Sequence, residues 1–234
     1  HGVGLTHEIW QPQLDFFKDY SNLSYDILGH GKSSLKKEKI SFDDFSNQLI
    51  ELLNDLKIDK IHLIGFSIGS LIARNFATKF NDRLKSLILL GSIYKRSEEQ
   101  QKVVNSRFDQ AKKELKLSKQ ALKRWFTDEY LKKNTGTYEK ISSILSSNNM
   151  SNFLKVYELF VRHKNDEDFE KIKVNTLIMT GEYDVGSTVE MSEELNKIIK
   201  NSEIKIIKDG KHLCGIECAD DVNLTIKNFV DKNE

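Results

Sequence analysis

The feature that most constrains the fold is a serine flanked by glycines in the stretch IHLIGFSIGS. The apolar run that ends at Phe66 predicts a buried strand, and the stretch after it predicts a helix. Gly65 and Gly69 lie two residues before and two residues after Ser67. A chain that turns this tightly from strand to helix has no room for side chains at those positions. The pattern favours a sharp turn that exposes Ser67 as a nucleophile over a simple helix N-cap.

Strand candidates alternate with amphipathic helices over most of the chain. In the helix predicted over 41–58, apolar side chains recur on one face, and Ser41 with Asp44 forms a capping-box pattern. Alternation of this kind predicts an α/β fold, with a mostly parallel sheet and helices on both faces. The strand candidates are LSYDIL (23–28), KIHLIGF (60–66), LKSLILLGS (84–92), VNTLIMTGE (174–182) and SEIKIIKDG (202–210).

The alternation stops between residues 95 and 168. No strand candidate occurs there, and the stretches QALKRWFTDEYL and MSNFLKVYELFVRH each predict an amphipathic helix. The sequence therefore predicts a core made of residues 1–94 and 169–234, with a helical segment of residues 95–168 inserted between two strands.

Charge and composition argue against several classes of partner. Lys and Arg total 36 and Asp and Glu total 35, so the net charge is +1 and predicts neither nucleic-acid nor membrane binding. We find no signal peptide and no apolar run of the roughly 18 residues that a membrane span needs, and we expect a cytoplasmic protein. Cys214 and Cys218 are too few for a disulfide framework or a metal site. The oligomeric state is not readable from these features.

A serine nucleophile needs a base, and His212 is the best-placed of six histidines. It follows the last strand candidate, on a glycine-bearing loop at the expected carboxyl edge of the sheet. His62 lies inside a strand and His30 in a turn, where we expect both to have structural roles. The remaining histidines lie in the opening stretch or at the end of a helix of the inserted segment: His1, His7 and His163.

The base needs an acid to orient it, and Asp184 lies directly after a strand candidate. Asp26 and Glu182 are the rival acids. A lone Asp after a strand is usually a turn residue. However, the chain order Ser67, Asp184, His212, with each residue just beyond a strand, is the order of one known catalytic triad.

The segments HGVGLTHEIW, YDILGHGKS, GFSIGS, GEYDVGST and GKHLCGIE resemble the α/β-hydrolase superfamily, and together they extend over the whole chain. The resemblance implies an oxyanion hole formed by the backbone N–H groups of Val3 and Ile68, and a helical cap over residues 95–168. GEYDVGST and the RWF of the inserted segment look most like the branch of 3-oxoadipate enol-lactonases and small esterases. In the family, up to three strands precede the His-Gly-x-Gly turn, so we expect an N-terminally incomplete core.

These residues predict a serine hydrolase that cleaves a small carboxylic ester or lactone, an enol-lactone among the candidates, through an acyl-enzyme and without metal or cofactor. A serine at position 67 argues against relatives with an aspartate nucleophile. The alternatives are a carbon–carbon bond hydrolase with the same triad and a non-catalytic ligand-binding receptor. Arg124 and Arg162 are candidate partners of a substrate carboxylate, although solvated charges are the simpler interpretation. The candidate substrate pocket consists of Trp125, Phe126, Tyr130, Phe160, Val185 and Leu213.

Overall fold

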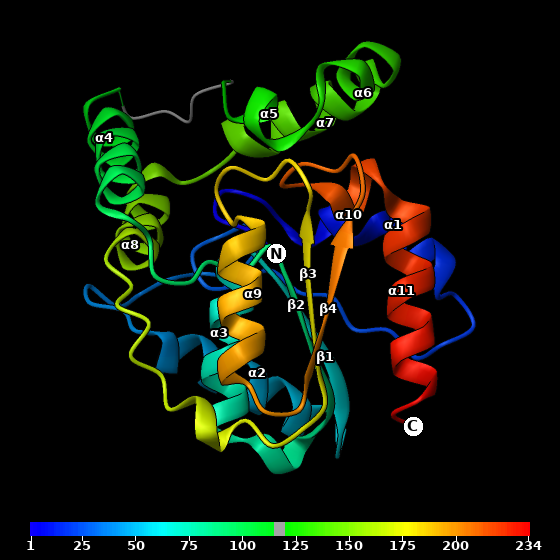
Figure 1. Cartoon of the computed structure of the whole chain (residues 1–234). Helices are drawn as coiled ribbons and strands as arrows, with labels where there is room; N and C mark the ends of the chain where they lie inside the picture. The colour runs from blue at the N-terminus through cyan, green and yellow to red at the C-terminus, as the bar shows by residue number, and fades with distance from the viewer. Residues whose placement is uncertain (115–119) are drawn as a thin grey trace.

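The computed structural model describes residues 1–114 and 120–234, and its centre is one four-stranded sheet. All the strand pairs are parallel, and the spatial order of the strands is their order in the chain. Helices join the consecutive strands (Figure 1), so the predicted α/β fold with a parallel sheet is confirmed. The strands are β1 (Ile61–Phe66), β2 (Leu84–Leu90), β3 (Thr176–Gly181) and β4 (Ser202–Ile207).

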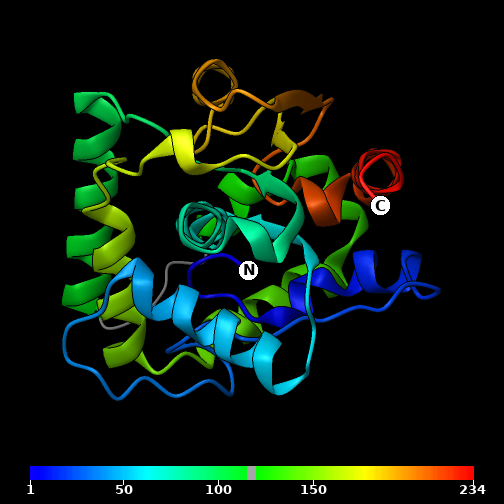
Figure 2. The ribbon, with the colours of Figure 1, turned by 90° about the horizontal axis from the view of Figure 1, so that it is seen from below.

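Both faces of the sheet are buried under helices. Neighbouring residues of a strand point to opposite faces. Leu87 and Leu89 of β2 therefore pack with α3 (Ile68–Lys79) and α9 (Val189–Ile198), whereas Ile88 and Leu90 pack with α11 (Ala219–Asp231). Figures 1 and 2 show α3 and α9 on one side of the strands and α11 on the other. The remaining helices and helical turns outside the insert are η1 (His7–Trp10), α1 (Gln11–Phe16), α2 (Phe42–Asp55), η2 (Asn81–Arg83), η3 (Phe169–Lys171) and α10 (Cys214–Glu217).

Helix α2 begins where the capping-box pattern placed its start. The Asp44 carboxylate accepts a hydrogen bond from the Ser41 backbone N–H at 2.9 Å, which satisfies one donor left free at a helix N-terminus. Phe45, Leu49 and Leu53 are buried on one face of the helix. The predicted amphipathic helix is therefore present, with its apolar face against the core.

The strand predicted at LSYDIL is wrong, because residues 23–28 form no strand and do not join the sheet. Side chains accept the backbone hydrogen bonds that a neighbouring strand would otherwise accept. The N–H of Ile27 donates to His1 Nε2 at 3.0 Å, and that of Leu28 donates to Gln48 Oε1 at 3.1 Å. An apolar run alone does not specify which partner its backbone meets.

Helices fill the segment between β2 and β3, as predicted, and lie beyond the carboxyl ends of the strands (Figure 1). We call residues 95–168 the insert. The stretch predicted as one helix over 120–131 is two, because the chain turns at Phe126 and Thr127, and the Thr127 side chain caps the second helix. Among the described residues, no helix is both long and apolar enough to cross a membrane. The insert helices are α4 (Glu98–Glu114), α5 (Gln120–Trp125), α6 (Asp128–Lys133), α7 (Thr135–Ser146) and α8 (Met150–Val161).

Candidate active site

Ser67 lies in the turn between β1 and α3, with φ 55° and ψ −118°. A residue with a side chain adopts this conformation only where its surroundings enforce it. The Ser67 N–H donates to Leu90 O at 3.0 Å, and its carbonyl accepts from Ser70 Oγ at 2.5 Å. A Cβ on Gly65 would lie 2.2 Å from Gly69 O, which is the steric reason why this turn requires glycine.

His212, which follows β4, lies directly against Asp184, which follows β3. The distance from His212 Nδ1 to Asp184 Oδ2 is 2.6 Å. The other carboxylate oxygen of Asp184 accepts from the N–H groups of Gly186 at 2.8 Å and Ser187 at 3.0 Å, so the acid is fixed in orientation. A carboxylate at Nδ1 selects the tautomer with its proton on that atom and leaves Nε2 as a proton acceptor.

Both rival acids have other partners. Asp26 accepts from the backbone N–H and from Nδ1 of His7, each at 2.8 Å, and Glu182 accepts from the Asp209 N–H at 3.0 Å. Burial disfavours ionisation of Asp26, but hydrogen bonds from His7 and Lys32 outweigh it and hold its pKa below the ordinary value. Of the three acids considered, the structure brings Asp184 to His212.

The opening loop, residues 1–4, lies close to the Ser67 turn. A Cβ on Gly69 would lie 2.9 Å from His1 O, so the second glycine of the motif makes room for this loop. Within residues 1–114 and 120–234, no acceptor bonds the N–H of Val3 or that of Ile68. Both predicted oxyanion donors therefore have no hydrogen-bond partner in the described part of the chain, although Ile68 itself is fully buried.

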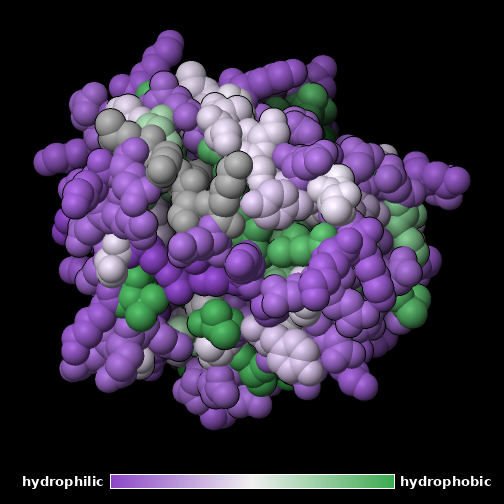
Figure 3. All heavy atoms as spheres, turned by 90° about the horizontal axis from the view of Figure 1, so that it is seen from above, coloured by the Kyte–Doolittle hydropathy of each residue, from purple (hydrophilic) through white to green (hydrophobic). Residues whose placement is uncertain are grey.

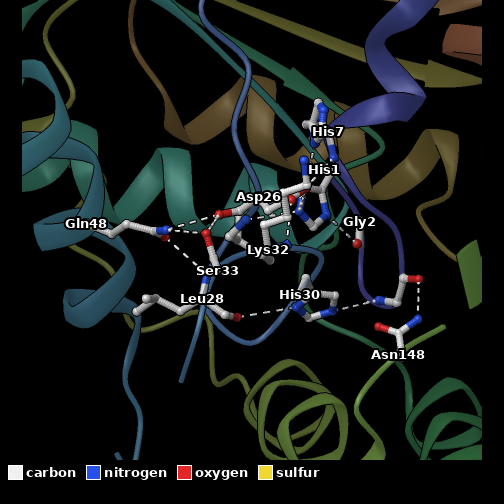
Figure 4. A network of polar contacts seen from close by, with 12 residues as sticks. His1, Gly2, His7, Asp26, Leu28, His30, Lys32, Ser33, Gln48 and Asn148 are labelled. Atoms are coloured by element: carbon white, nitrogen blue, oxygen red, sulfur yellow. Dashed lines mark hydrogen bonds and ion pairs between the residues drawn. The ribbon is translucent and has the colours of Figure 1, made fainter. Parts of the chain in front are cut away.

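Gly4, next in the chain, is held on both sides (Figure 4). Its N–H donates to His30 Nε2 at 2.8 Å, and its carbonyl accepts from the Asn148 side-chain amide at 2.8 Å. Burial lowers the pKa of His30 to about 4, so His30 is neutral near pH 7, as an acceptor nitrogen must be. His30 therefore contacts its own turn, as predicted, and also holds the opening loop through Gly4.

A cavity of about 580 Å³ lies between the core and the insert. Ser67, Asp184, His212 and Val3 line it, together with residues of α4, α5 and α8. Its size is typical of small-molecule sites. Seen from the insert side, the molecular surface is mostly hydrophilic, with separate apolar patches between the polar side chains (Figure 3).

The cavity wall contains half of the predicted pocket. Phe126 is fully buried and stacks on Tyr130 with ring centroids 5.2 Å apart, and Leu213 lies in the same core cluster. These three residues pack against the interior and do not line the cavity, so their assignment to the pocket was wrong. Aromatic spacing on an amphipathic helix does not separate the face toward the core from the face toward a cavity. The predicted residues that line the cavity are Trp125, Phe160 and Val185.

Arg124 lines the cavity, whereas Arg162 forms an exposed ion pair with Glu158 at 2.7 Å. Sequence analysis missed Arg107 and Arg96, which also line it. Arg107 lies on α4, whose cavity-facing positions recur every three or four residues, so helical spacing held a usable signal. In the highly charged stretch over α4, that signal is hidden among solvated side chains.

The arginines that line the cavity, Arg96, Arg107 and Arg124, have different surroundings. The Arg96 guanidinium lies 4.6 Å from the centroid of the Phe160 ring and donates to Phe160 O, and burial lowers its pKa to about 10. Burial and the neighbouring charge of Arg107 lower the pKa of Arg124. Within the described part of the chain, neither Arg107 nor Arg124 forms an ion pair with a carboxylate. No group of three or more His, Cys, Asp or Glu side chains in that part is arranged to hold a metal ion.

This fold and this arrangement of residues define the class of the protein. The family model described as alpha/beta hydrolase fold matches residues 1–217, and the chain belongs to the α/β hydrolases. The predicted family and the predicted class of enzyme, a hydrolase, are thereby confirmed.

Similar proteins include two from Acinetobacter baylyi. One is an (E)-2-((N-methylformamido)methylene)succinate hydrolase, 27% identical over 99% of this chain and 88% of its own length. The other is 3-oxoadipate enol-lactonase 2, 24% identical over 93% of this chain and 81% of its own length. The enol-lactonase from Burkholderia xenovorans superimposes with a TM-score of 0.90 at 23% identity, over 98% of this chain and 88% of its own, which is a likeness of fold.

Proposed function

We propose that the protein is a serine hydrolase of small carboxylic esters or lactones, with residues 95–168 as a cap over a core of residues 1–94 and 169–234. The observation that carries the proposal is that Ser67 and the bonded pair Asp184–His212 line one cavity. Ser67 lies in an enforced turn at the cavity wall, and the contact of His212 Nδ1 with Asp184 leaves Nε2 as the acceptor nitrogen. These are the parts that nucleophilic catalysis by a hydroxyl requires.

In the proposed reaction, Ser67 Oγ attacks the carbonyl carbon while His212 Nε2 takes its proton. The N–H groups of Val3 and Ile68 stabilise the oxyanion that forms. The intermediate collapses to an acyl-enzyme as His212 returns the proton to the leaving oxygen. A water molecule, deprotonated by His212, then attacks the acyl carbon and releases the acid, and the proton returns to Ser67.

We propose further that the substrate carries a carboxylate, an enol-lactone of an oxo-dicarboxylic acid being one example. Arg107 and Arg124 bring two positive charges to the cavity without a described carboxylate partner. A guanidinium favours a carboxylate as its ligand because the two groups match in geometry and charge. The names of the two Acinetobacter relatives specify derivatives of succinate and oxoadipate, and both parent acids are dicarboxylates.

The proposal is tested first on the nucleophile. We expect the wild-type protein to hydrolyse p-nitrophenyl or lactone substrates and to be labelled at Ser67 by a fluorophosphonate, and Ser67→Ala to lose both properties at an unchanged melting temperature. Binding of ligands without turnover or labelling would favour a receptor. Turnover of a vinylogous 1,5-diketone but of no ester or lactone would favour a carbon–carbon bond hydrolase.

The substrate class is tested with a matched pair of arginines. Arg124→Gln should lower kcat/KM for carboxylate-bearing esters by about 10-fold to 100-fold, because a hydrogen bond to a charged group contributes about 1.5–3 kcal/mol. It should leave neutral esters nearly unchanged. Arg162→Gln, on the same insert but in solvent, should affect neither. Equal effects of the two substitutions would remove the evidence for a carboxylate subsite.

A further inference from the structure

The two peptide N–H groups next to the proposed base are both held. The N–H of Lys211 donates to Glu217 Oε2 at 3.0 Å, and the N–H of Leu213 donates to Trp125 O at 2.9 Å. These residues flank His212 on either side. The backbone from which the imidazole projects is therefore fixed at two points, one of them a carboxylate and the other a carbonyl of the insert.

Glu217 also reaches the insert. Its second oxygen, Oε1, accepts from the backbone N–H of Thr127 at 2.8 Å and from Thr127 Oγ1 at 2.5 Å. Hydrogen bonds to a carboxylate are stronger than those between neutral groups. Because Thr127 lies two residues after Trp125, both bonds next to His212 lead to the same turn of the insert, between α5 and α6.

The insert makes a corresponding contact with the opening loop. The Asn148 amide, between α7 and α8, donates to Gly4 O (Figure 4). It also donates to Ile144 O at 3.0 Å, so the end of α7 holds it in place. Gly4 follows Val3, whose N–H is one of the two proposed oxyanion donors. Since His30 bonds the other side of Gly4, removal of the Asn148 amide would leave Gly4 hydrogen-bonded from the core alone.

We propose that Glu217 and Asn148 are positioning residues, through which the insert holds the base and the oxyanion donor in reactive geometry. Glu217 acts on His212 and Asn148 acts on Val3, and neither touches the reacting atoms. The inference rests on the proposed function, since it concerns the efficiency of that reaction. It gives the insert a second role besides covering the cavity, because the insert then completes the catalytic geometry.

The two residues predict different kinetic signatures. In Glu217→Gln one oxygen becomes an amide nitrogen, which faces a donor at Lys211 or at Thr127. We expect kcat to fall about 10-fold to 100-fold with KM within about twofold, because misplacement of a catalytic group by about 1 Å has effects of that size. The apparent pKa in the pH profile of kcat/KM should also shift, because that profile reports the base.

Asn148→Ala should lower kcat by about 10-fold or more without moving the pH profile, because it acts on the oxyanion donor and not on the base. Its affinity for a boronic acid, which forms a tetrahedral adduct with the serine, should fall by the same factor. Both variants should also react more slowly than wild type with a fluorophosphonate, a readout that needs no knowledge of the natural substrate.

Neighbouring residues supply the controls. Glu129→Gln makes the same chemical change on α6, where Glu129 forms an exposed pair with Lys133, and Asn149→Ala removes only the cap of α8. Both should retain wild-type kcat and pH profile. If Glu217→Gln does not fold, Thr127→Val removes the hydroxyl bond to Glu217 together with the cap of α6, without a change of charge. Thr127→Ser, which keeps the hydroxyl, should retain wild-type kcat.

Three outcomes overturn the inference. The first is that the wild-type protein is active and that Glu217→Gln or Thr127→Val has the same kcat as wild type. The second is a loss of kcat in Glu217→Gln without a shift of the pH profile, or in Asn148→Ala without a matching loss of boronate affinity, which would mean a structural role only. The third is a wild-type protein that neither turns over substrate nor labels at Ser67, and this result alone overturns the proposed function as well.

Discussion

At the scale of single residues, the Ser67 turn combines strain with close packing. A backbone held at φ 55° costs on the order of 1–3 kcal/mol, which the bonds to Leu90 and Ser70 must offset. The turn leaves no space beside Gly65, where an added Cβ would lie 2.2 Å from Gly69 O. Ser67 is thus held at the cavity wall in a conformation that its neighbours enforce.

Gly65→Ala should therefore lower the free energy of unfolding by more than about 2 kcal/mol, because overpacking against backbone cannot relax by a side-chain rotation. Gly136→Ala is the matched control, since a Cβ there meets nothing within 4 Å. That substitution lies in α7 and should stabilise by about 0.4–1 kcal/mol. Urea denaturation measures both, and equal stabilities would contradict the steric argument.

His30 makes stability depend on pH. Burial lowers its folded-state pKa to about 4, whereas the unfolded chain titrates near 6.5. Between these values the unfolded state binds a proton that the folded state does not. The stabilisation is therefore complete above pH 6.5 and is lost as the pH falls towards 4, with a slope of up to about 1.4 kcal/mol per pH unit.

His30→Gln should flatten the fall of the melting temperature between pH 6.5 and 4, because glutamine does not titrate. His62, whose pKa burial also lowers, is only half-buried, and His62→Gln should change the slope less. Thermal unfolding at several pH values distinguishes the variants. A curve for His30→Gln parallel to that of wild type would mean that other groups control the pH dependence.

The part of the candidate site that lies at the ends of strands was predictable from the sequence. Ser67, Asp184 and His212 each follow a strand, and the carboxyl ends of parallel strands meet at one edge of the sheet, so sequence order alone brings them together. Arg107 and Glu217 were missed. Helical spacing marks the face of α4 that carries Arg107, but the packing of the insert over that edge decides what this face meets, and no local pattern encodes the contact of Glu217.

At the scale of elements, α3 is bonded to the segment that leaves the insert. Arg74 on α3 is fully buried, and its guanidinium pairs with Glu167 at 2.5 Å and also donates to Ile93 O. Burial disfavours ionisation of Glu167, but the hydrogen bond from His163 and the charge of Arg74 hold its pKa at about 2. The helix behind the nucleophile and the end of the insert thus share one buried ion pair.

Glu167→Ala should destabilise the fold by about 3–5 kcal/mol, because it leaves the Arg74 charge buried without a partner. The double variant Arg74→Met with Glu167→Ala should lose less than the single variant, since the unpaired charge is then gone. Glu194→Ala, which removes an exposed pair with Lys197, should cost less than about 1 kcal/mol. Denaturant titration tests the order, and a double variant less stable than Glu167→Ala would refute it.

The elements themselves were predictable where periodicity and burial agree, as in α2 and the four strands. The stretch at 23–28 was misassigned as a strand because strand formation needs a partner, and the backbone N–H groups of Ile27 and Leu28 bond side chains instead. The break between α5 and α6 was missed because apolar spacing continues across Phe126, whose burial arises from tertiary packing.

At the scale of the whole molecule, positive and negative charges nearly cancel. With 36 basic and 35 acidic side chains, the protein has little net field to attract an anionic substrate from a distance. The proposed preference for carboxylates must then arise inside the cavity, from Arg107 and Arg124. Groups that are partly shielded from solvent interact at short range and are screened less by salt than surface charges are.

The ratio of kcat/KM between a carboxylate-bearing ester and its neutral isostere should therefore change by less than about threefold between 0.05 and 0.5 M NaCl, although the Debye length shortens over that range. In Arg124→Gln the ratio should be low at every salt concentration, whereas in Arg162→Gln it should match wild type. Steady-state kinetics at constant pH measure all three proteins. A wild-type ratio that collapses towards that of Arg124→Gln as salt rises would instead place the selectivity in long-range attraction. In that case the two cavity arginines would have no local role in binding.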